Sequence, residues 1–188
     1  TILRVGNLSN RFSDGLFQMN VSENAFVNRL KSILNLQAIP DSFMGHHIEF
    51  TPVDLCANAI MKIANTNHPF SVLHLYNTEL VGCKELLEYI NHFGYCLQAV
   101  SDNEFKTRVT NYLNTETLKN GITGIVTDLT PDKTLNYIST VELSANISNS
   151  FLNSLGFYWP ILDESYFTKY LEFFKKTNYF IKNKEDKI

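Results

Sequence analysis

The run Ile2-Leu3-Arg4-Val5-Gly6-Asn7-Leu8 decides how the rest of this chain is interpreted. It is a short apolar segment that ends in Gly-Asn, which is typical of a buried strand followed by a turn. In open α/β sheets, ligands bind just beyond the carboxyl ends of the strands. We therefore expect Gly6 and Asn7 to lie at the edge of a binding site.

The composition is that of a folded protein. Of the 188 residues, 44% are hydrophobic and 13% aromatic, enough for one domain with a full core or for one lobe of a larger domain. The formal net charge of −3 does not supply the basic surface that nucleic-acid binding needs. The sequence has no apolar run near the roughly 20 residues of a membrane span, and no signal peptide.

The spacing of cysteine and histidine indicates neither a disulfide framework nor a metal site. The three cysteines, Cys56, Cys83 and Cys96, contain no C-x-x-C pair. His46 and His47 are adjacent, so they would not share a helix face, and no third ligand has a recognisable spacing. We expect no metal, and reduced thiols in a cytoplasmic protein.

Apolar periodicity and turn residues divide the chain into strands and helices. Strands are expected at 2–6, 48–50, 72–76 and 95–100. Helices are expected at 23–36, about 53–65, 83–93, after the capping residues 101–104, from 144 or 146 to 155, and after Asp163. Ser22 or Asn20 would cap the first of these helices and Asp163 the last, while Gly94 and Gly156 would follow the ends of two others. Aromatic residues at helical spacing in the last helix favour a packed core over a cradle for an acyl chain. One compact α/β unit is the simplest interpretation.

Thr51-Pro52-Val53-Asp54 has the pattern of a helix start. Thr51 is expected to be the N-cap and Pro52 the first helical residue, with Asp54 reciprocating the cap. Free backbone N–H groups and the helix dipole explain Asp54 better than catalysis does. The role expected for this segment is therefore structural.

Four segments together resemble a known family: residues 4–7, 11–15 and 49–54, and Leu155-Gly156-Phe157 with the aromatic helix after it. In this order they resemble the C-terminal part of an extended short-chain dehydrogenase/reductase. More narrowly, they are similar to the terminal thioester reductase domain of nonribosomal peptide synthetases and carboxylic acid reductases. The resemblance implies an α/β fold, with the last strands of a Rossmann lobe and a mostly helical substrate-binding subdomain. Within a single compact fragment, 1–188, the Rossmann part would be 1–10 and about 48–80, and the substrate-binding part about 11–47 and 81–188.

The resemblance also implies an activity and its partners. The intact domain would use NADPH to release an acyl or peptidyl thioester from the phosphopantetheine arm of a carrier protein, as an aldehyde or an alcohol. The family's catalytic Ser/Thr, Tyr and Lys, and its Gly-rich turn, would lie upstream of Thr1, because no tyrosine of this chain has Lys four residues later. We therefore expect the N-terminal cofactor-binding half to be absent, and this chain alone to be inactive and not to bind NADPH.

Position relative to the first strand suggests the site residues. By resemblance, its end lines the nicotinamide side of the cofactor pocket, so Gly6, Asn7 and Leu8 are the expected cofactor-binding residues. The following loop is the expected substrate or pantetheine contact. Its candidate residues, together with Asn7, are Arg11, Phe17, Gln18 and Asn20.

Two other classes of protein stay open. One is a fragment of a different extended reductase, of the nucleotide-sugar epimerase or dehydratase type. A diphosphate site would need basic residues, and the substrate side offers mainly Arg11 and Arg29. The other is a non-catalytic module that docks an acidic carrier protein through a patch such as Lys169, Lys175 and Lys176. A solvated face of the last helix explains those lysines better.

Overall fold

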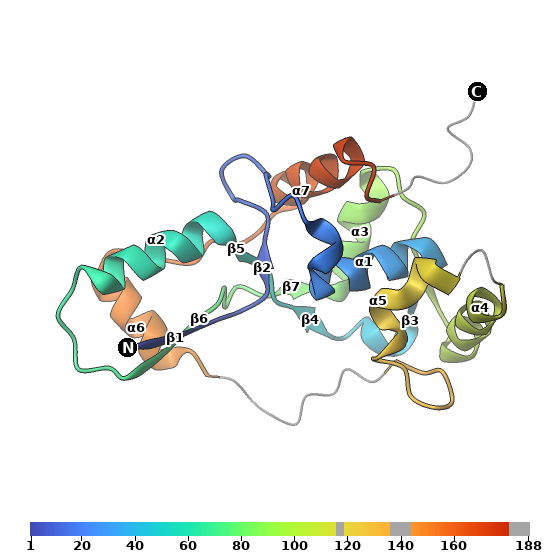
Figure 1. Cartoon of the computed structure of the whole chain (residues 1–188), viewed down its shortest axis with the longest axis horizontal. Helices are drawn as coiled ribbons and strands as arrows, with labels where there is room; N and C mark the ends of the chain where they lie inside the picture. The colour runs from blue at the N-terminus through green and yellow to red at the C-terminus, as the bar shows by residue number, and fades with distance from the viewer. Residues whose placement is uncertain (116–118, 136–143, 181–188) are drawn as a thin grey trace. The chain divides into compact units, whose positions relative to one another are not determined.

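The computed structural model describes residues 1–115, 119–135 and 144–180 (Figure 1). The helices are α1 (Ala25–Leu36), α2 (Val53–Ala64), α3 (Cys83–His92), α4 (Asp102–Asn114), α5 (Thr123–Val126), α6 (Asn146–Ser154) and α7 (Glu164–Lys176). The strands are β1 (Ile2–Val5), β2 (Leu8–Ser9), β3 (Ala38–Pro40), β4 (His47–Ile48), β5 (Thr51–Pro52), β6 (Val72–Leu75), β7 (Val81–Gly82) and β8 (Gln98–Val100). No helix among the described residues is long and apolar enough to cross a membrane.

The described strands pair two by two. β1 runs parallel to β6, β2 to β5 and β3 to β8, while β4 pairs with β7. The last residues of β1 and β6, Val5 and Leu75, lie opposite each other. Because parallel strands run in the same direction, the segments that leave two paired strands start side by side. The residues after β1 and β6 are therefore neighbours.

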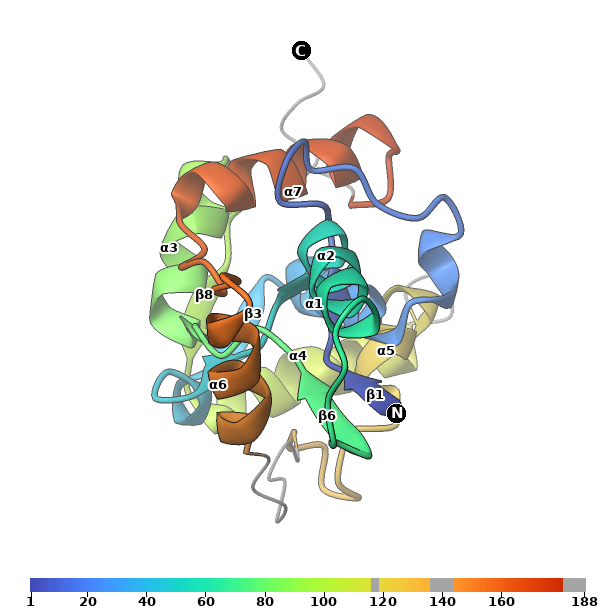
Figure 2. The same cartoon turned by 90° about the vertical axis from the view of Figure 1, so that its left-hand side faces the viewer.

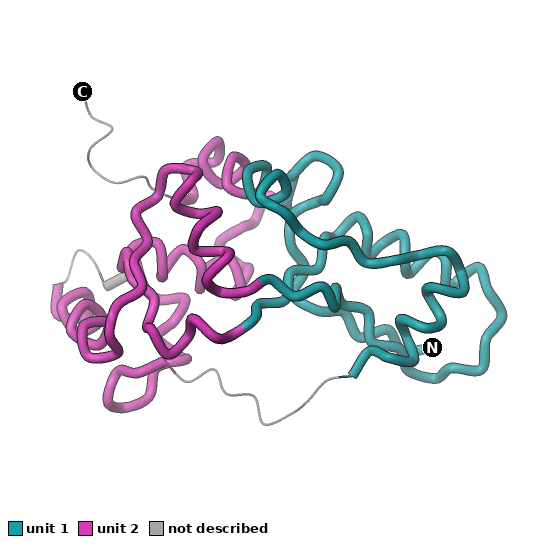
Figure 3. Tube along the Cα trace, turned by 180° about the vertical axis from the view of Figure 1, so that it is seen from behind, with its two compact units in different colours: residues 1–17, 47–81, 139–170 teal, residues 18–46, 82–138, 171–188 magenta. Residues whose placement is uncertain are grey.

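The chain forms two compact units, and each is described by itself (Figure 3). The first unit consists of the described residues within Thr1–Phe17, His47–Val81 and Ser139–Tyr170. The second consists of those within Gln18–His46, Gly82–Ile138 and Leu171–Ile188. Assigning one unit to a Rossmann lobe and the other to substrate binding stays a prediction, since compactness does not reveal function.

A hydrophobic core holds the first unit together. Figure 2 shows β1 and β6 side by side, with α2 and α6 near them. The buried face of α2 presents Cys56, Ala59 and Ile63, whose spacing of three and four residues places them on one side of a helix. They pack with Leu73, Leu75, Leu152 and Phe157. Tyr166, Phe167 and Tyr170 of α7 are also buried, so the predicted packed role of these aromatic residues is confirmed.

In the second unit, α1 packs closely on α5. Arg29 of α1 donates two hydrogen bonds to the Asp128 carboxylate, from Nε at 2.6 Å and from Nη2 at 3.1 Å. Gly124 of α5 faces the backbone of Asn28, and a Cβ at position 124 would lie well inside van der Waals contact with the Asn28 carbonyl group. The absence of a side chain at Gly124 therefore sets how closely the two helices approach.

Gly124→Ala should destabilise the chain. Alanine has the better helix propensity by about 1 kcal/mol, but overpacking against the fixed backbone of α1 costs about 1–3 kcal/mol. We expect a lower midpoint of chemical denaturation. Gly45→Ala is the matched control, because nothing lies within 4 Å of a Cβ built at Gly45. Equal midpoints for the two variants would contradict the packing argument.

Most helix ends follow the predicted caps, with two corrections. Ser101 accepts from the Glu104 N–H, Asp163 accepts from the Tyr166 N–H, and Gly94 and Gly156 follow their helices with positive φ, as predicted. The first helix is capped by Asn24, which accepts from the Val27 N–H at 3.0 Å, and not by Ser22 or Asn20. The second correction concerns Thr51: α2 has no side-chain cap at its N-terminus.

Candidate functional site

The carboxyl ends of β1 and β6 form the candidate site. Gly6 and Asn7 follow β1, while Tyr76 and Asn77 follow β6. The Gly6 N–H donates to the Leu75 carbonyl at 3.0 Å, which continues the parallel pairing past the end of β1. β5 begins at the same place, because its Thr51 N–H donates to the Asn7 carbonyl at 2.9 Å. We call the set Gly6, Asn7, Glu49, Thr51, Tyr76 and Asn77 the strand-end site.

Glu49 connects the segments of the strand-end site. Its Oε2 accepts a hydrogen bond from the Asn7 backbone N–H at 2.7 Å, and its Oε1 accepts one from the Thr51 hydroxyl. The Thr51 Oγ1 in turn accepts from the Asn77 backbone N–H at 2.8 Å. Thr51 and Asn77 are fully buried. One carboxylate thus joins the ends of β1 and β6 through the hydroxyl of β5.

The electrostatics of the site centre on Glu49. Burial raises the pKa of Glu49, and the hydrogen bonds from Asn7 and Thr51 offset only part of that effect. The pKa values of Cys56 and Tyr76 are raised by burial first and then by the Glu49 charge. With a raised pKa, Glu49 stabilises the fold most below the ordinary carboxyl value of 4.5, and this contribution is lost as pH rises through the folded-state pKa.

The hydroxyl of Thr51 does not cap α2, so the predicted capping box is wrong. The Thr51 hydroxyl donates to Glu49, which lies before the helix, and accepts from the Asn77 N–H, which is distant in sequence. Asp54 also contacts a segment that is distant in sequence. Its carboxylate accepts hydrogen bonds from the Phe12 N–H at 2.8 Å and from the Ser13 N–H at 3.1 Å. Burial opposes ionisation of Asp54, but these hydrogen bonds outweigh it and lower the pKa. Its expected structural role is confirmed.

The space beside Gly6 is filled by the protein itself. A Cβ at Gly6 would lie 2.5 Å from Glu49 Oε1 and 2.5 Å from the Cβ of Tyr76. Glycine is therefore required at this position by its neighbours within the unit, whatever ligand binds there. The backbone N–H and carbonyl of Asn7 are also used internally, which leaves its exposed side chain available to a ligand.

The other predicted site residues fall into both units. Leu8 packs against the core of the first unit. Arg11 is exposed and forms a salt bridge with Asp14 at 3.1 Å, and Phe17 is half-buried. Gln18 and Asn20 belong to the second unit, where the Gln18 side chain donates to the Asn20 carbonyl at 3.4 Å. Of the predicted residues, Gly6 and Asn7 thus lie directly after β1, while Leu8 begins β2.

Glu49, Thr51 and Asn77 were not predicted as site residues. Glu49 and Thr51 lie in a segment for which only a structural role was expected. Their hydrogen bonds to the end of β1 depend on the position of β5 beside it, which the sequence does not reveal. Asn77 could have been found, because it follows the expected strand 72–76 and strand ends gather in parallel sheets. Among the residues that the structure describes, no group of three His, Cys, Asp or Glu could hold a metal ion.

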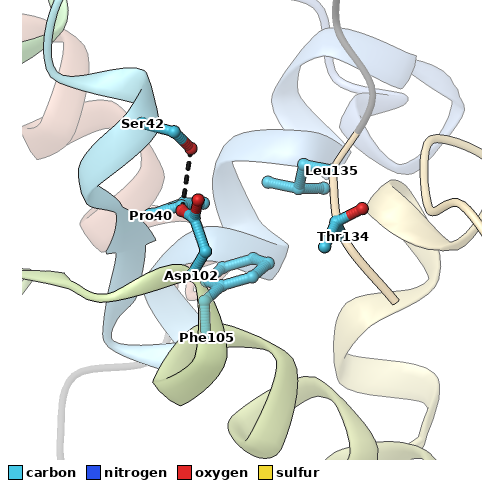
Figure 4. Close-up of a pocket in the computed structure, with 6 residues that line it drawn as sticks. All are labelled: Pro40, Ser42, Asp102, Phe105, Thr134 and Leu135. Atoms are coloured by element: carbon cyan, nitrogen blue, oxygen red, sulfur yellow. Dashed lines mark hydrogen bonds between the residues drawn. The ribbon is translucent and has the colours of Figure 1, made fainter. Parts of the chain in front are cut away.

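The second unit contains a separate cavity of about 260 Å³ (Figure 4). It lies where β3 and β8 end, and its lining residues are Pro40, Ser42, Asp102, Phe105, Thr134 and Leu135. The Ser42 hydroxyl donates to Asp102 Oδ1 at 2.8 Å. No candidate residue had been predicted here, since Ser42 and Asp102 come from distant segments.

The lysines proposed as a docking patch have other partners. Lys169 Nζ lies 3.4 Å from the Phe12 carbonyl, and Lys176 forms an exposed ion pair with Glu172 at 3.7 Å. Lys175 lies 6.0 Å from the ring centre of Phe93. The interactions of Lys169 and Lys176 favour local structural roles over a common patch.

Several solved structures are similar to this chain. The chain is similar over 95% of its length to a thiolation-reductase di-domain from an archaeal non-ribosomal peptide synthetase, with 30% identity and a TM-score of 0.82. It is similar over 98% of its length to the terminal R domain from the myxalamid PKS-NRPS biosynthetic pathway, with 18% identity and a TM-score of 0.77. The aureusimine biosynthetic cluster reductase domain has 22% identity over 94% of the chain and a TM-score of 0.69.

These likenesses confirm the fold class and the family resemblance inferred from the sequence. The chain has the α/β fold of part of an extended short-chain dehydrogenase/reductase, and it resembles the terminal reductase domains of nonribosomal peptide synthetases. It spans 36%, 45% and 44% of the three reductase-containing chains, less than half of each. No family model and no curated protein matches the sequence.

Thr51→Val tests the hydrogen bonds of the strand-end site. Valine keeps the shape of threonine but leaves the buried Asn77 N–H without its acceptor and Glu49 Oε1 without its donor. We expect a loss of about 1–3 kcal/mol in the free energy of unfolding, measured by chemical denaturation. Thr51→Ser retains the hydroxyl and should stay closer to the wild type. Equal losses for the two variants would show that packing of the methyl group, and not hydrogen bonding, is what matters.

Proposed function

We propose that this chain is the substrate-binding portion of an NADPH-dependent thioester reductase domain. The domain would release an acyl or peptidyl thioester from a carrier protein, as an aldehyde or an alcohol. The observation that carries the proposal is the 30% identity to a reductase joined to a thiolation domain, maintained over 95% of this chain. A thiolation domain is a carrier domain, which supports a phosphopantetheine thioester as the substrate.

The free edge of β1 supports pairing with a further part of the domain. The Ile2 and Gly6 N–H groups face β6, so those of Leu3 and Val5 point to the opposite edge of β1. Among the described strands β1 pairs only with β6, and Ile2 and Val5 are 61% and 45% exposed. Parallel sheets are normally covered on both faces, and the unpaired N–H and C=O groups of an edge strand can pair with another strand. We infer that a strand of the cofactor-binding half pairs with this edge.

Within this proposal the chain's residues bind and orient, and the bound NADPH supplies the hydride. The residues fit the cofactor in part. The exposed Asn7 side chain is free to contact a ligand, whereas Gly6 and the Asn7 backbone are occupied by Glu49, Tyr76 and Thr51. Arg11, Phe17, Gln18 and Asn20 remain the proposed substrate contacts. The proton donor would come from the Ser/Thr, Tyr and Lys expected upstream.

The chain by itself should not reduce a thioester. We expect no oxidation of NADPH, followed by its absorbance, when the purified chain is mixed with an acyl-pantetheine thioester. The physical reason is that neither the Gly-rich turn nor the Tyr-Lys pair is present in the sequence. The positive control is a protein extended to the length of the similar reductases. Turnover by the chain alone of roughly 1 per second or faster would contradict the proposal.

Asn7→Ala should impair the extended protein. If the Asn7 side chain contacts the substrate or cofactor, its loss should lower kcat/KM by about 1–3 kcal/mol, or roughly 5- to 150-fold. Asn67→Ala is the matched control, because Asn67 is an exposed asparagine of the same unit outside the strand-end site. Unchanged kcat/KM in Asn7→Ala would remove the strand end from the active site while leaving the reductase assignment intact.

A further inference from the structure

The environment of Glu49 in the folded chain disfavours its ionised carboxylate. Burial raises its pKa, so ionising this carboxylate in the folded chain costs free energy. Among the described residues no cationic side chain forms an ion pair with it. Glu49 is half-buried, so its carboxylate is only partly shielded from water. What the carboxylate has instead is a pair of donors, the Asn7 N–H and the Thr51 hydroxyl.

We propose that the Glu49 carboxylate is the residue that positions the Gly6–Asn7 strand end, and that this hold weakens when the carboxylate takes up a proton. Glu49 is then a positioning residue that makes the strand-end site sensitive to pH. The structural part of the proposal concerns only this chain. Its consequence for catalysis rests on the proposed reductase function.

A count of donors and acceptors shows why the charge matters. In the ionised state both carboxylate oxygens accept, one from the Asn7 N–H and one from the Thr51 hydroxyl, while Thr51 Oγ1 accepts from the Asn77 N–H. A proton on Oε1 would point at Thr51 Oγ1, and the Thr51 hydrogen would lose its acceptor. A proton on Oε2 would face the Asn7 N–H, donor against donor. Protonation at Oε1 thus reverses the bond with Thr51 and leaves the Asn7 N–H on a neutral acceptor, whereas protonation at Oε2 breaks the Asn7 bond. Either form of the neutral acid therefore weakens the hold on Asn7, because a hydrogen bond to a charged acceptor is the stronger one.

Glu49 titrates in a different pH range from the titratable groups near it. Among the described residues, Cys56 of α2 and Tyr76 after β6 are titratable groups that feel the charge of Glu49. The pKa values of both are raised, so neither carries charge when Glu49 titrates. Glu49 titrates above the ordinary carboxyl value of 4.5, and the neighbouring Asp54 below the ordinary 3.8. On acidification Glu49 is thus protonated before Asp54. Its protonation adds to folding stability, so loosening of the strand end would not be a sign of unfolding.

The test is an NMR titration of this chain, which needs no cofactor or substrate. The carboxyl carbon of Glu49 and the amide protons of Asn7 and Asn77 are followed as pH is lowered. We expect the Glu49 midpoint above 4.5 and an upfield shift of the Asn7 amide proton with the same midpoint, because its acceptor loses its charge. Glu49→Gln should abolish that shift. The exposed Glu88 of α3 provides the matched control, since Glu88→Gln should leave it unchanged.

A second variant tests the coupling to Thr51. Because the Thr51 hydroxyl stabilises the ionised form, Thr51→Val should move the Glu49 midpoint upward, whereas Thr51→Ser should not. In the extended protein the acid limb of the kcat/KM profile should follow the same midpoint, with about a tenfold loss per pH unit below it.

The outcomes are decisive even if a variant fails to fold, because the wild-type titration stands alone. An Asn7 amide proton that does not follow the Glu49 midpoint overturns the proposal, whether or not the extended protein is a reductase. An inactive extended protein whose Asn7 amide does follow Glu49 leaves the positioning role in place and removes the reductase function.

Discussion

The parallel pairing of β1 with β6 is the constraint on which the strand-end site depends. It ends both strands at the same level, with Val5 opposite Leu75, and so places the segments that follow them side by side. β5 then bonds to the Asn7 carbonyl, and its threonine hydroxyl reaches the Asn77 N–H. Without this pairing, Glu49 would have no second segment to hold. The carboxylate completes an arrangement that the strands have already set up.

Gly6 illustrates how a glycine at a strand end can be required by its protein neighbours as well as by a ligand. At a strand end, a glycine allows a ligand to approach the backbone closely. The structure gives a nearer cause, because Glu49 and Tyr76 already occupy the volume of a side chain at Gly6. Substituting Gly6 would therefore disturb the protein before it disturbed a ligand. A glycine that lines a cleft is evidence about the cofactor only when no protein atom fills the same space.

The sequence predicted those features whose cause lies within a few residues. Ser101, Asp163, Gly94 and Gly156 act on their own helix ends, through a hydrogen bond three residues away or a positive φ, and each lies where the pattern indicated. Thr51 shows the limit. The same local pattern predicted a cap, but a buried hydroxyl takes the partners that the tertiary fold offers, which here are Glu49 and Asn77. The strand end was predictable, whereas the network that holds it was not.

Backbone and side-chain groups have different roles at the strand-end site. Both backbone groups of Asn7 are satisfied inside the unit, so a ligand at this strand end meets side chains. The fold is shared with the archaeal reductase at a TM-score of 0.82, although 30% of the residues are identical. Side chains can therefore change while the fold persists. In the proposed function, the fold places the strand end, and side chains such as those of Asn7 and Arg11 determine which ligand binds there. The likeness in fold therefore supports the class of reaction, whereas the choice of substrate depends on those side chains.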